Sequence, residues 1–184
     1  MKKLQSECYK VKNFAEIDCW IFDLDNTLYP ASTDLFRQIN VKMSNYIMNL
    51  LDVNRIAANK MRAEYWKKYG TSLAGLMQNH KVDPEDFLSV VHDIDFSVLK
   101  KDSNLLNALN KLPGRKLVYT NGTVPYAGEV LKHRGLLDAF DEIYGIEDAD
   151  YVPKPFTKAF EIIFSKASIV HNRSVMFEDE VRNL

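Results

Sequence analysis

The chain of 184 residues is 46% hydrophobic and 27% charged, which is sufficient for one sizeable core and a small second lobe. Its 24 lysines and arginines nearly balance its 25 acidic residues, so nothing in the charge favours a nucleic acid polymer or an anionic membrane as a partner. A catalytic or small-ligand role fits this balance better.

The cysteine content and the lack of long apolar segments bear on the cellular location. Only Cys8 and Cys19 are present, so a disulfide framework is not expected and a reducing cytoplasm is the expected compartment. Residues 1–12 lack the apolar core of a signal peptide, and no stretch approaches the ~18 apolar residues of a membrane span. We therefore expect a soluble cytoplasmic protein.

The first predicted element is a buried strand over 19–22, after a polar lead-in over 1–18. Its four residues, Cys-Trp-Ile-Phe, are apolar and directly precede Asp23-Leu24-Asp25-Asn26-Thr27. Ligands of open α/β sheets lie at the carboxyl ends of the strands. The pattern therefore predicts a strand that opens into a polar site.

Residues 30–96 show the periodicity of helices. Apolar side chains recur three and four residues apart from Leu35 to Leu50, Gly70 is a predicted helix end, and Asp83-Pro84 is a predicted helix start. Four helices are expected in this segment. The expected capping side chains before the first three are Ser32, Thr33 or Asp34, then Asp52 or Asn54, then Thr71 or Ser72.

From residue 102 onward, predicted strands and helices alternate. Strands are expected over 116–120, 142–146 and 174–177, with helical patterns between them, which indicates parallel βαβ units. The predicted fold class is α/β, with a Rossmann-like parallel sheet. Its expected division is a discontinuous core of 1–29 and 97–184 and an inserted helical lobe of 30–96.

Asp23 and Asp25 are the first candidate catalytic residues. Side chains alternate along an extended segment, so one carboxylate can face a reacting atom while the other reaches the leaving group. Asp23 as a nucleophile would form an acyl-phosphate or an ester, and Asp25 could donate and then accept a proton. Close carboxylates repel, so a hard cation such as Mg²⁺ would help to keep Asp23 ionised. Taken alone, however, an Asp-rich turn also caps helices, and so short a pattern recurs by chance.

The segments after the later predicted strands add further polar groups. Thr120-Asn121-Gly122 precedes a helix, which suits a phosphate and equally a simple helix cap. Lys154 stands between two prolines and Glu178-Asp179 follows the last strand, and both are also typical of ordinary surface charge. Because the carboxyl ends of parallel strands lie on one edge of the sheet, all these groups should converge. The assembled set predicts a phosphoryl-transfer site.

The ordered set D-x-D-x-T, Thr, Lys-Pro and E-D resembles the haloacid dehalogenase (HAD) superfamily of aspartyl-phosphate phosphatases, over nearly the whole chain. The resemblance implies that 30–96 is that superfamily's small α-helical cap domain. Longer strings resemble the pyrimidine 5'-nucleotidase branch found in bacteria and yeasts. They are Phe22-Asp23-Leu24-Asp25-Asn26-Thr27-Leu28-Tyr29-Pro30, Tyr69-Gly70-Thr71-Ser72-Leu73, His92-Asp93-Ile94-Asp95, and Phe177-Glu178-Asp179 with Arg182-Asn183-Leu184.

The resemblance implies a role for each matching residue of the core. Asp23 would attack phosphorus to give the aspartyl-phosphate, and Asp25 would protonate the leaving oxygen and later activate water. Thr120 and the backbone of Asn121 would hold phosphate oxygens. Lys154 would neutralise the phosphate and Asp23.

The resemblance also implies a Mg²⁺ site. Its ligands would be Asp23, the backbone carbonyl of Asp25, and Asp179, with Glu178 as a further candidate. Glu180 is a departure, because relatives often have a small or uncharged residue there. The detailed charge balance at the metal is therefore open.

The implied substrate is a small phosphorylated metabolite, a pyrimidine nucleoside monophosphate. UMP and CMP are expected to be preferred over AMP and GMP, since a pocket sized for one ring excludes a two-ring base. Two alternatives stay open: a sugar-phosphate phosphatase or phosphomutase, and an impaired domain that serves as a binding module. Candidates to meet the base or sugar, each also a plausible packing residue, are Tyr29, Tyr69, Thr71, His80 and His92.

Compared with that superfamily, the sequence stops at Leu184, where relatives continue through another helix and strand. The comparison implies a C-terminally truncated core whose last strand lacks a neighbour and a covering helix. We expect either that the natural product continues beyond Leu184 or that the chain self-associates.

Overall fold

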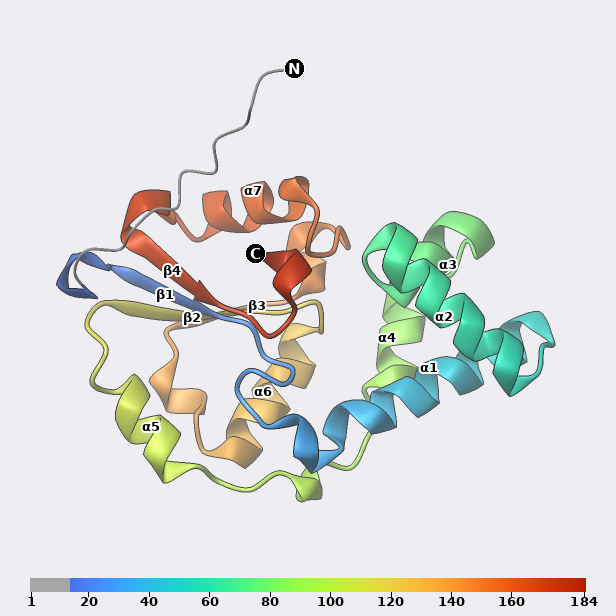
Figure 1. The fold of residues 1–184 in the computed structure, drawn as a ribbon, viewed down its shortest axis with the longest axis horizontal. Coiled ribbons are helices and arrows are strands. Elements are labelled where there is room, and N and C mark those ends of the chain that lie inside the picture. Colours follow the sequence, from blue (N-terminus) through green and yellow to red (C-terminus); the bar gives the residue numbers. More distant parts are fainter. Residues whose placement is uncertain (1–13) are drawn as a thin grey trace, which may run out of the picture.

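A computed structural model describes residues 14–184, and a parallel sheet of four strands lies at its centre (Figure 1). Residues 1–13, with Cys8 and most of the lead-in, lie outside the described residues. The strand order is β3-β2-β1-β4, and Cys19 of β1 pairs with Arg115 and Ser174 of its two neighbours. The strands are β1 (Cys19–Phe22), β2 (Arg115–Tyr119), β3 (Glu142–Tyr144) and β4 (Ser174–Phe177).

Helices cover both faces of the sheet, because the central strands are apolar on both sides. Trp20 and Phe22 of β1 face α5 (Ser103–Leu109) and α6 (Val124–Arg134). Cys19 and Ile21 alternate with them and face α7 (Thr157–Lys166) on the other side. Figure 1 shows this order of layers, with α7 above the sheet and α5 and α6 below it. The α/β fold with a parallel sheet is confirmed.

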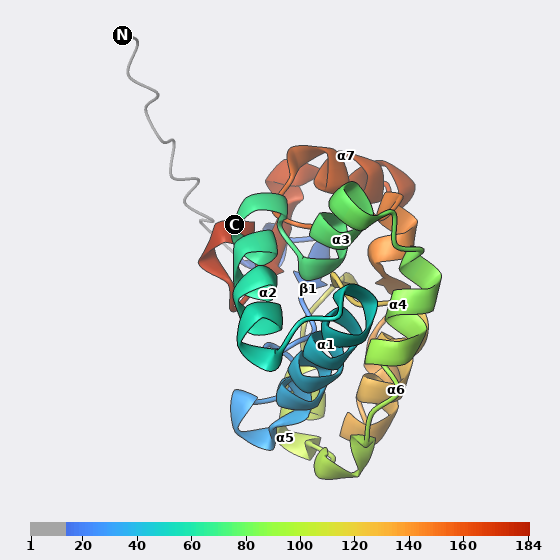
Figure 2. The same ribbon diagram turned by 90° about the vertical axis from the view of Figure 1, so that its right-hand side faces the viewer.

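Four further helices stand beyond the carboxyl ends of the strands (Figures 1 and 2). The view in Figure 2 looks onto these helices, with the sheet behind them. They pack on one another, α1 against α2 and α4, and α2 against α3. Their bounds are α1 (Leu35–Leu51), α2 (Arg55–Tyr69), α3 (Ser72–His80) and α4 (Pro84–Val91), and we refer to them together as the cap helices.

The ends of the cap helices follow their local sequence. The side chains of Asn54, Thr71 and Asp83 cap α2, α3 and α4 by accepting hydrogen bonds from backbone N–H groups of the first turn. Gly70 ends α2 at a φ of 88°, which favours glycine. Asp34 precedes α1 but makes no capping hydrogen bond, because its own backbone is left-handed with φ of 59°.

Short 3₁₀ segments connect the main elements and shift some predicted boundaries. The strand expected over 142–146 ends at Tyr144, and a 3₁₀ segment begins at Ile146. None of the helices within 14–184 is long and apolar enough to cross a membrane. The 3₁₀ segments are Phe14–Glu16, Ala31–Thr33, Phe96–Val98, Leu137–Ala139, Ile146–Ala149, His171–Arg173 and Val181–Asn183.

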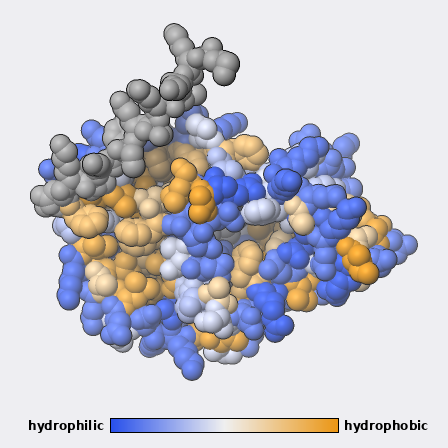
Figure 3. Space-filling model, viewed as in Figure 1, coloured by the Kyte–Doolittle hydropathy of each residue, from blue (hydrophilic) through white to orange (hydrophobic). Residues whose placement is uncertain are grey.

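Hydrophobic side chains are unevenly distributed over the surface seen in Figure 3. They gather over the sheet side of the molecule, whereas the outer surface of the cap helices is mostly hydrophilic. Phe177 at the end of β4 is 40% exposed and Val181 is 80% exposed. The site described next lies between these two parts of the molecule.

Candidate active site

A cavity of about 540 Å³ lies between the carboxyl edge of the sheet and the cap helices. Its size is within the range of small-molecule sites. The sheet side contributes five acids, namely Asp23, Asp25, Glu178, Asp179 and Glu180. The cap side contributes mainly apolar and neutral polar residues together with Arg62.

Lys154 lies directly below the cavity and is 1% exposed. Its ammonium group donates to Asp23 Oδ1 at 2.7 Å, to Glu178 Oε2 at 2.6 Å and to the Tyr119 carbonyl at 3.0 Å. Three donors thus meet three acceptors, so the burial of this charge is compensated. The lysine that follows Pro153 in sequence therefore lies at the centre of the site.

Asn121 fixes the backbone of that lysine. Its Oδ1 accepts from the Lys154 backbone N–H at 2.8 Å, and its Nδ2 donates to the Lys154 carbonyl at 3.2 Å. The segment after β2 and the Lys154 loop are therefore held together by one side chain. The sequence predicted a phosphate contact for the Asn121 backbone, and the structure adds this role for its amide.

Asp23 carries the carboxylate that Lys154 contacts. Burial raises the pKa of Asp23 to about 7, Glu178 and Asp25 add to the rise, and the Lys154 ammonium opposes it. The group is thus poised between its two protonation states, and a further nearby cation would favour the carboxylate. Such a carboxylate at the floor of a cavity can act as a nucleophile.

Asp25 has a different environment, although it is only two residues away. The hydroxyls of Tyr29 and Tyr126 both donate to Asp25 Oδ1, each at 2.6 Å. Burial raises the pKa of the Asp25 carboxyl, and the two phenol hydrogen bonds partly offset that rise. The two acids of one motif are therefore differentiated, with an ammonium on the first and two hydroxyls on the second.

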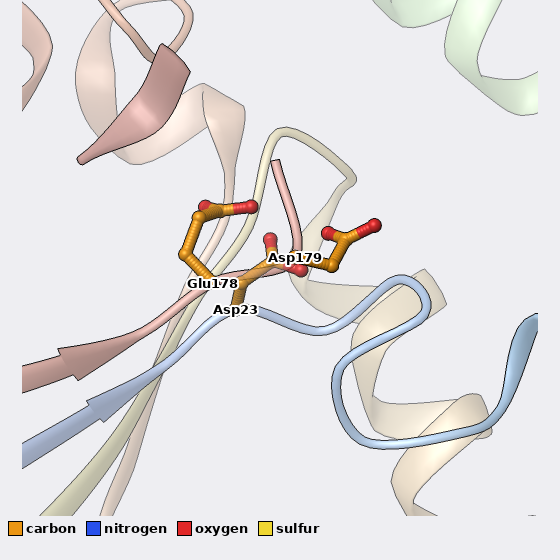
Figure 4. A group of neighbouring side chains, drawn as sticks. All are labelled: Asp23, Glu178 and Asp179. Carbon is orange, nitrogen blue, oxygen red and sulfur yellow. The ribbon is translucent and has the colours of Figure 1, made fainter. Parts of the chain in front are cut away.

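Three carboxylates gather where β1 and β4 end (Figure 4). Asp23, Glu178 and Asp179 each offer an oxygen atom within 4.8 Å of the other two. Carboxylate oxygens are the ligands that Mg²⁺ prefers, so this donor set fits that ion. Glu178 already accepts from Lys154 with one oxygen and from the Glu180 backbone with the other, so Asp23 and Asp179 are better placed to hold a cation.

The other sequence-predicted residues are brought to the site to different degrees. Thr120 lies at the end of β2, is fully buried, and accepts from the Gly122 backbone at 2.9 Å. Thr71 and His92 line the cavity, while Tyr29 reaches the site only through Asp25. Tyr69 and His80 lie outside the cavity lining and contact Asn79 and Tyr65 instead.

Tyr126 and Arg62 are residues that sequence reasoning missed. Tyr126 stacks on His92, with ring centroids 4.3 Å apart, and donates to Asp25. The available signal was a tyrosine in the first turn of the helix that follows the second strand. Arg62 gave a weaker signal, because a single arginine on a helix is usually solvated.

This fold and acidic site agree with the comparison to known families. The chain matches the model of the haloacid dehalogenase-like hydrolases over residues 17–184, and it belongs to that family. It is 28% identical over 178 residues to Phosphate metabolism protein 8 of Saccharomyces cerevisiae, covering 88% of this chain and 55% of the yeast protein. The chain thus spans about half the length of that curated relative.

Solved structures of the family share the fold. A structure described as a predicted phosphatase from Clostridium acetobutylicum has a TM-score of 0.56 at 17% identity, covering 91% of this chain and 78% of its own. A HAD phosphatase from Thermococcus onnurineus has a TM-score of 0.54 at 17% identity, covering 90% of this chain and 79% of its own. At this identity the likeness concerns the architecture alone.

Proposed function

We propose that this protein is a Mg²⁺-dependent phosphomonoester hydrolase that acts through an aspartyl-phosphate on Asp23. The observation that carries the proposal is the Lys154 ammonium 2.7 Å from Asp23 Oδ1 at the floor of the cavity. A cation there supports an ionised nucleophile and offsets the charge of an incoming phosphate. Mg²⁺ bound by Asp23 and Asp179 would add Lewis-acid stabilisation of the phosphate oxygens.

In the first step, an Asp23 oxygen attacks phosphorus and the bond from phosphorus to the ester oxygen breaks. In this proposal Asp25 starts as the neutral acid, a form that its burial favours, and gives its proton to the departing oxygen. The products are an alcohol and the aspartyl-phosphate. Lys154 stays within reach of Asp23 throughout, so the charge on the phosphoryl group is opposed without rearrangement.

In the second step, water attacks the phosphorus of the aspartyl-phosphate. Asp25, now a carboxylate, takes the proton from that water, and the bond between phosphorus and the Asp23 oxygen breaks. Inorganic phosphate leaves and both aspartates return to their starting states. Thr120 and the backbone N–H groups after β2 are the proposed ligands of the phosphate oxygens.

The test is phosphate release by the purified chain from a panel of phosphomonoesters, with and without Mg²⁺, for wild type and Asp23→Asn. We expect Asp23→Asn to abolish turnover while its melting temperature stays measurable, because an amide cannot accept the phosphoryl group. Excess chelator should also stop the wild-type reaction. Asp93→Asn, at an exposed acid outside the cavity, is the matched control. Near wild-type turnover by Asp23→Asn would overturn the mechanism.

For the substrate, we propose pyrimidine nucleoside 5'-monophosphates, UMP and CMP. The Tyr69-Gly70-Thr71 string that resembles the pyrimidine branch lies against the Lys154 loop: a Cβ on Gly70 would meet the Lys154 carbonyl at 3.2 Å. Thr71 from the same string lines the cavity. The proposal is contradicted if AMP and GMP are turned over as well as UMP and CMP.

The cytoplasm is the location that accompanies this proposal. Cys19, the free cysteine of the described residues, is buried at the start of β1 and has no disulfide partner among them. A reducing compartment is compatible with such a thiol. Fractionation of cells that express the tagged protein would check the location.

A further inference from the structure

A polar cluster lies on the cap side of the cavity, opposite the catalytic acids. Its members are Asn40 and Ser44 of α1 with Asn59 and Arg62 of α2, and we refer to them as the Arg62 cluster. Asn40, Asn59 and Arg62 line the cavity, and Ser44 is 1% exposed beneath them. The proposed reaction uses none of these residues.

Hydrogen bonds within the cluster occupy the side-chain oxygen atoms of Asn40, Ser44 and Asn59. The Arg62 guanidinium donates through Nη2 to Asn40 Oδ1 and through Nη1 to Ser44 Oγ at 3.0 Å. Since a guanidinium cannot accept, these contacts fix which end of the Asn40 amide faces Arg62. Ser44 Oγ lies 2.7 Å from Asn59 Oδ1 and 2.9 Å from the Asn40 carbonyl, so its hydrogen also stays within the cluster.

What the cluster leaves free are donors. The Nδ2 groups of Asn40 and Asn59 have no acceptor within residues 14–184, and the buried Nε of Arg62 has none there either. The described residues also place no acid within ion-pairing distance of Arg62, and burial alone lowers the pKa of its guanidinium. The five acids that line the cavity all lie on the sheet side.

We infer that the Arg62 cluster binds an oxygen acceptor on the leaving group of the substrate, a ring carbonyl or a carboxylate. This rests on the proposed function, because it requires a phosphate bound at Asp23 and the rest of the molecule pointing toward α1 and α2. Arg62 is half-buried, and a buried donor such as its Nε costs stability when no acceptor meets the cluster, so a ligand oxygen at these donors would be favoured. A site built in this way discriminates strongly against analogues that lack the oxygen.

UMP and CMP both carry a carbonyl on the ring beside the bond to the sugar, whereas adenine has no carbonyl. The Arg62 cluster therefore gives the proposed preference over AMP a chemical basis in addition to size, whereas guanine, which has a ring carbonyl of its own, would be excluded by size. Ribose 5-phosphate retains the phosphate and sugar and lacks the ring, which makes it the reference substrate. Phosphoserine provides a carboxylate in place of the ring carbonyl.

The experiment compares kcat/KM for UMP, phosphoserine and ribose 5-phosphate in wild type, Arg62→Met and Arg55→Met. Arg55 lies on the same helix and donates to Asn45 at 2.7 Å outside the cavity, so Arg55→Met is the matched control. We expect the wild-type preference for UMP over ribose 5-phosphate to fall at least tenfold in Arg62→Met and to persist in Arg55→Met. Arg62→Lys, which retains a donor for Asn40 or Ser44, should lose part of the preference.

The outcomes separate the two oxygen sources. If only the preference for phosphoserine depends on Arg62, the acceptor is a carboxylate, and the pyrimidine assignment fails while the inference stands. If Arg62→Met and Arg62→Lys keep both preferences, or if wild type shows neither preference, the inference is wrong. A structural role for Arg62 would lower the melting temperature and reduce turnover of the three esters by the same factor, which also overturns it.

A binding measurement covers the case in which no ester is hydrolysed and the proposed function fails. Calorimetric titration of UMP and of phosphoserine into Asp23→Asn protein is then compared with Asp23→Asn combined with Arg62→Met. A tenfold or greater loss of affinity for either ligand supports the Arg62 cluster as its binding site. Equal affinities, or no binding in both proteins, contradict it.

Discussion

The cavity has a sheet wall, formed by the carboxyl edge of the sheet, and a cap wall, formed by the cap helices. The two walls differ in how their charged groups are paired. On the sheet side, Lys154 lies between two carboxylates and Asp25 between two phenols, so the charged groups there have partners within the protein. On the cap side, Arg62 is held by neutral side chains only. On the sheet side Lys154 and Asp25 thus have partners within the protein, whereas on the cap side several donors have no acceptor among the described residues. Under the proposed function, this difference would separate the chemistry at the phosphate from selection of the leaving group.

The largest expected effect comes from breaking the sheet wall at Lys154. Lys154→Met leaves Asp23 and Glu178 without their shared cation, so we expect turnover to fall by at least 10²-fold, as for loss of an oxyanion donor. Because the lysine is 1% exposed, we also expect a loss of about 3–5 kcal/mol in unfolding free energy.

Urea unfolding and phosphate release measure the two effects in the same protein. Lys166→Met removes a partly exposed ion pair with Asp148 and should change stability by less than about 1 kcal/mol. If Lys154→Met were as stable and as active as Lys166→Met, neither stability nor turnover would depend on the Lys154 ammonium.

His92 connects the two walls, since it stands at the end of α4 and stacks on Tyr126. Burial lowers its pKa to about 4, from 6.5. Between pH 6.5 and 4, His92 binds a proton in the unfolded chain but not in the folded chain. The unfolding free energy therefore falls as the pH falls from 6.5 toward 4. The contribution is about 1.4 kcal/mol per pH unit.

His92→Gln should therefore show a flatter decline of unfolding free energy between pH 6.5 and 4 than wild type, measured by urea titration at each pH. Comparing the two slopes removes the contributions of the buried aspartates, which the proteins share. His171→Gln, at an exposed histidine, should keep the wild-type slope. Parallel curves for wild type and His92→Gln would show that His92 takes up its proton in the folded state.

Tyr126→Phe is expected to have a smaller effect on the sheet wall. It removes one of two hydrogen bonds to Asp25, each worth about 1 kcal/mol, and so should reduce kcat by roughly fivefold to tenfold. The loss should be greater for ribose 5-phosphate than for p-nitrophenyl phosphate, because a good leaving group needs less protonation. Equal losses on both esters would indicate that Tyr126 does not act through Asp25.

The smallest expected effect is that of Tyr119→Phe. The Tyr119 hydroxyl is buried and finds no partner in the described chain, so its removal should leave stability unchanged or slightly raised. Thermal unfolding would measure this, and turnover should be retained because Lys154 contacts the carbonyl and the ring face of Tyr119, both of which phenylalanine keeps. A loss comparable to that of Tyr126→Phe would mean that the two phenols have similar roles.

The sequence predicted the sheet wall better than the cap wall, for a physical reason. The sheet wall is built from residues in the segments that follow parallel strands, namely Asp23 after β1, Lys154 after β3 and Glu178 after β4. The direction of the strands alone brings these segments to one edge of the sheet. The contact between Tyr126 and Asp25, 101 residues apart, depends in addition on the rotation of α6 about its axis. Periodicity identifies the buried face of a helix but not the atom that a side chain reaches.

The cap side depends still more on packing between helices. Tyr69 and Trp66 are three residues apart on α2, yet only Trp66 lines the cavity. Arg62 could be recognised as a half-buried cation held by neutral groups only after α1 placed Asn40 and Ser44 beside it. Which residues select the substrate therefore could not be predicted from patterns within one helix.

The paired phenols on Asp25 have a consequence for the timing of the two half-reactions. Since both hydroxyls contact Oδ1, the proposed mechanism would use the other oxygen of the same carboxyl group to give the proton to the ester and to take one from water. The carboxyl group need not turn over between the steps, and its orientation is already set when the chain folds. The enzyme would then return to its starting state by proton movement alone, with no side-chain rotation to limit how fast one turnover follows another.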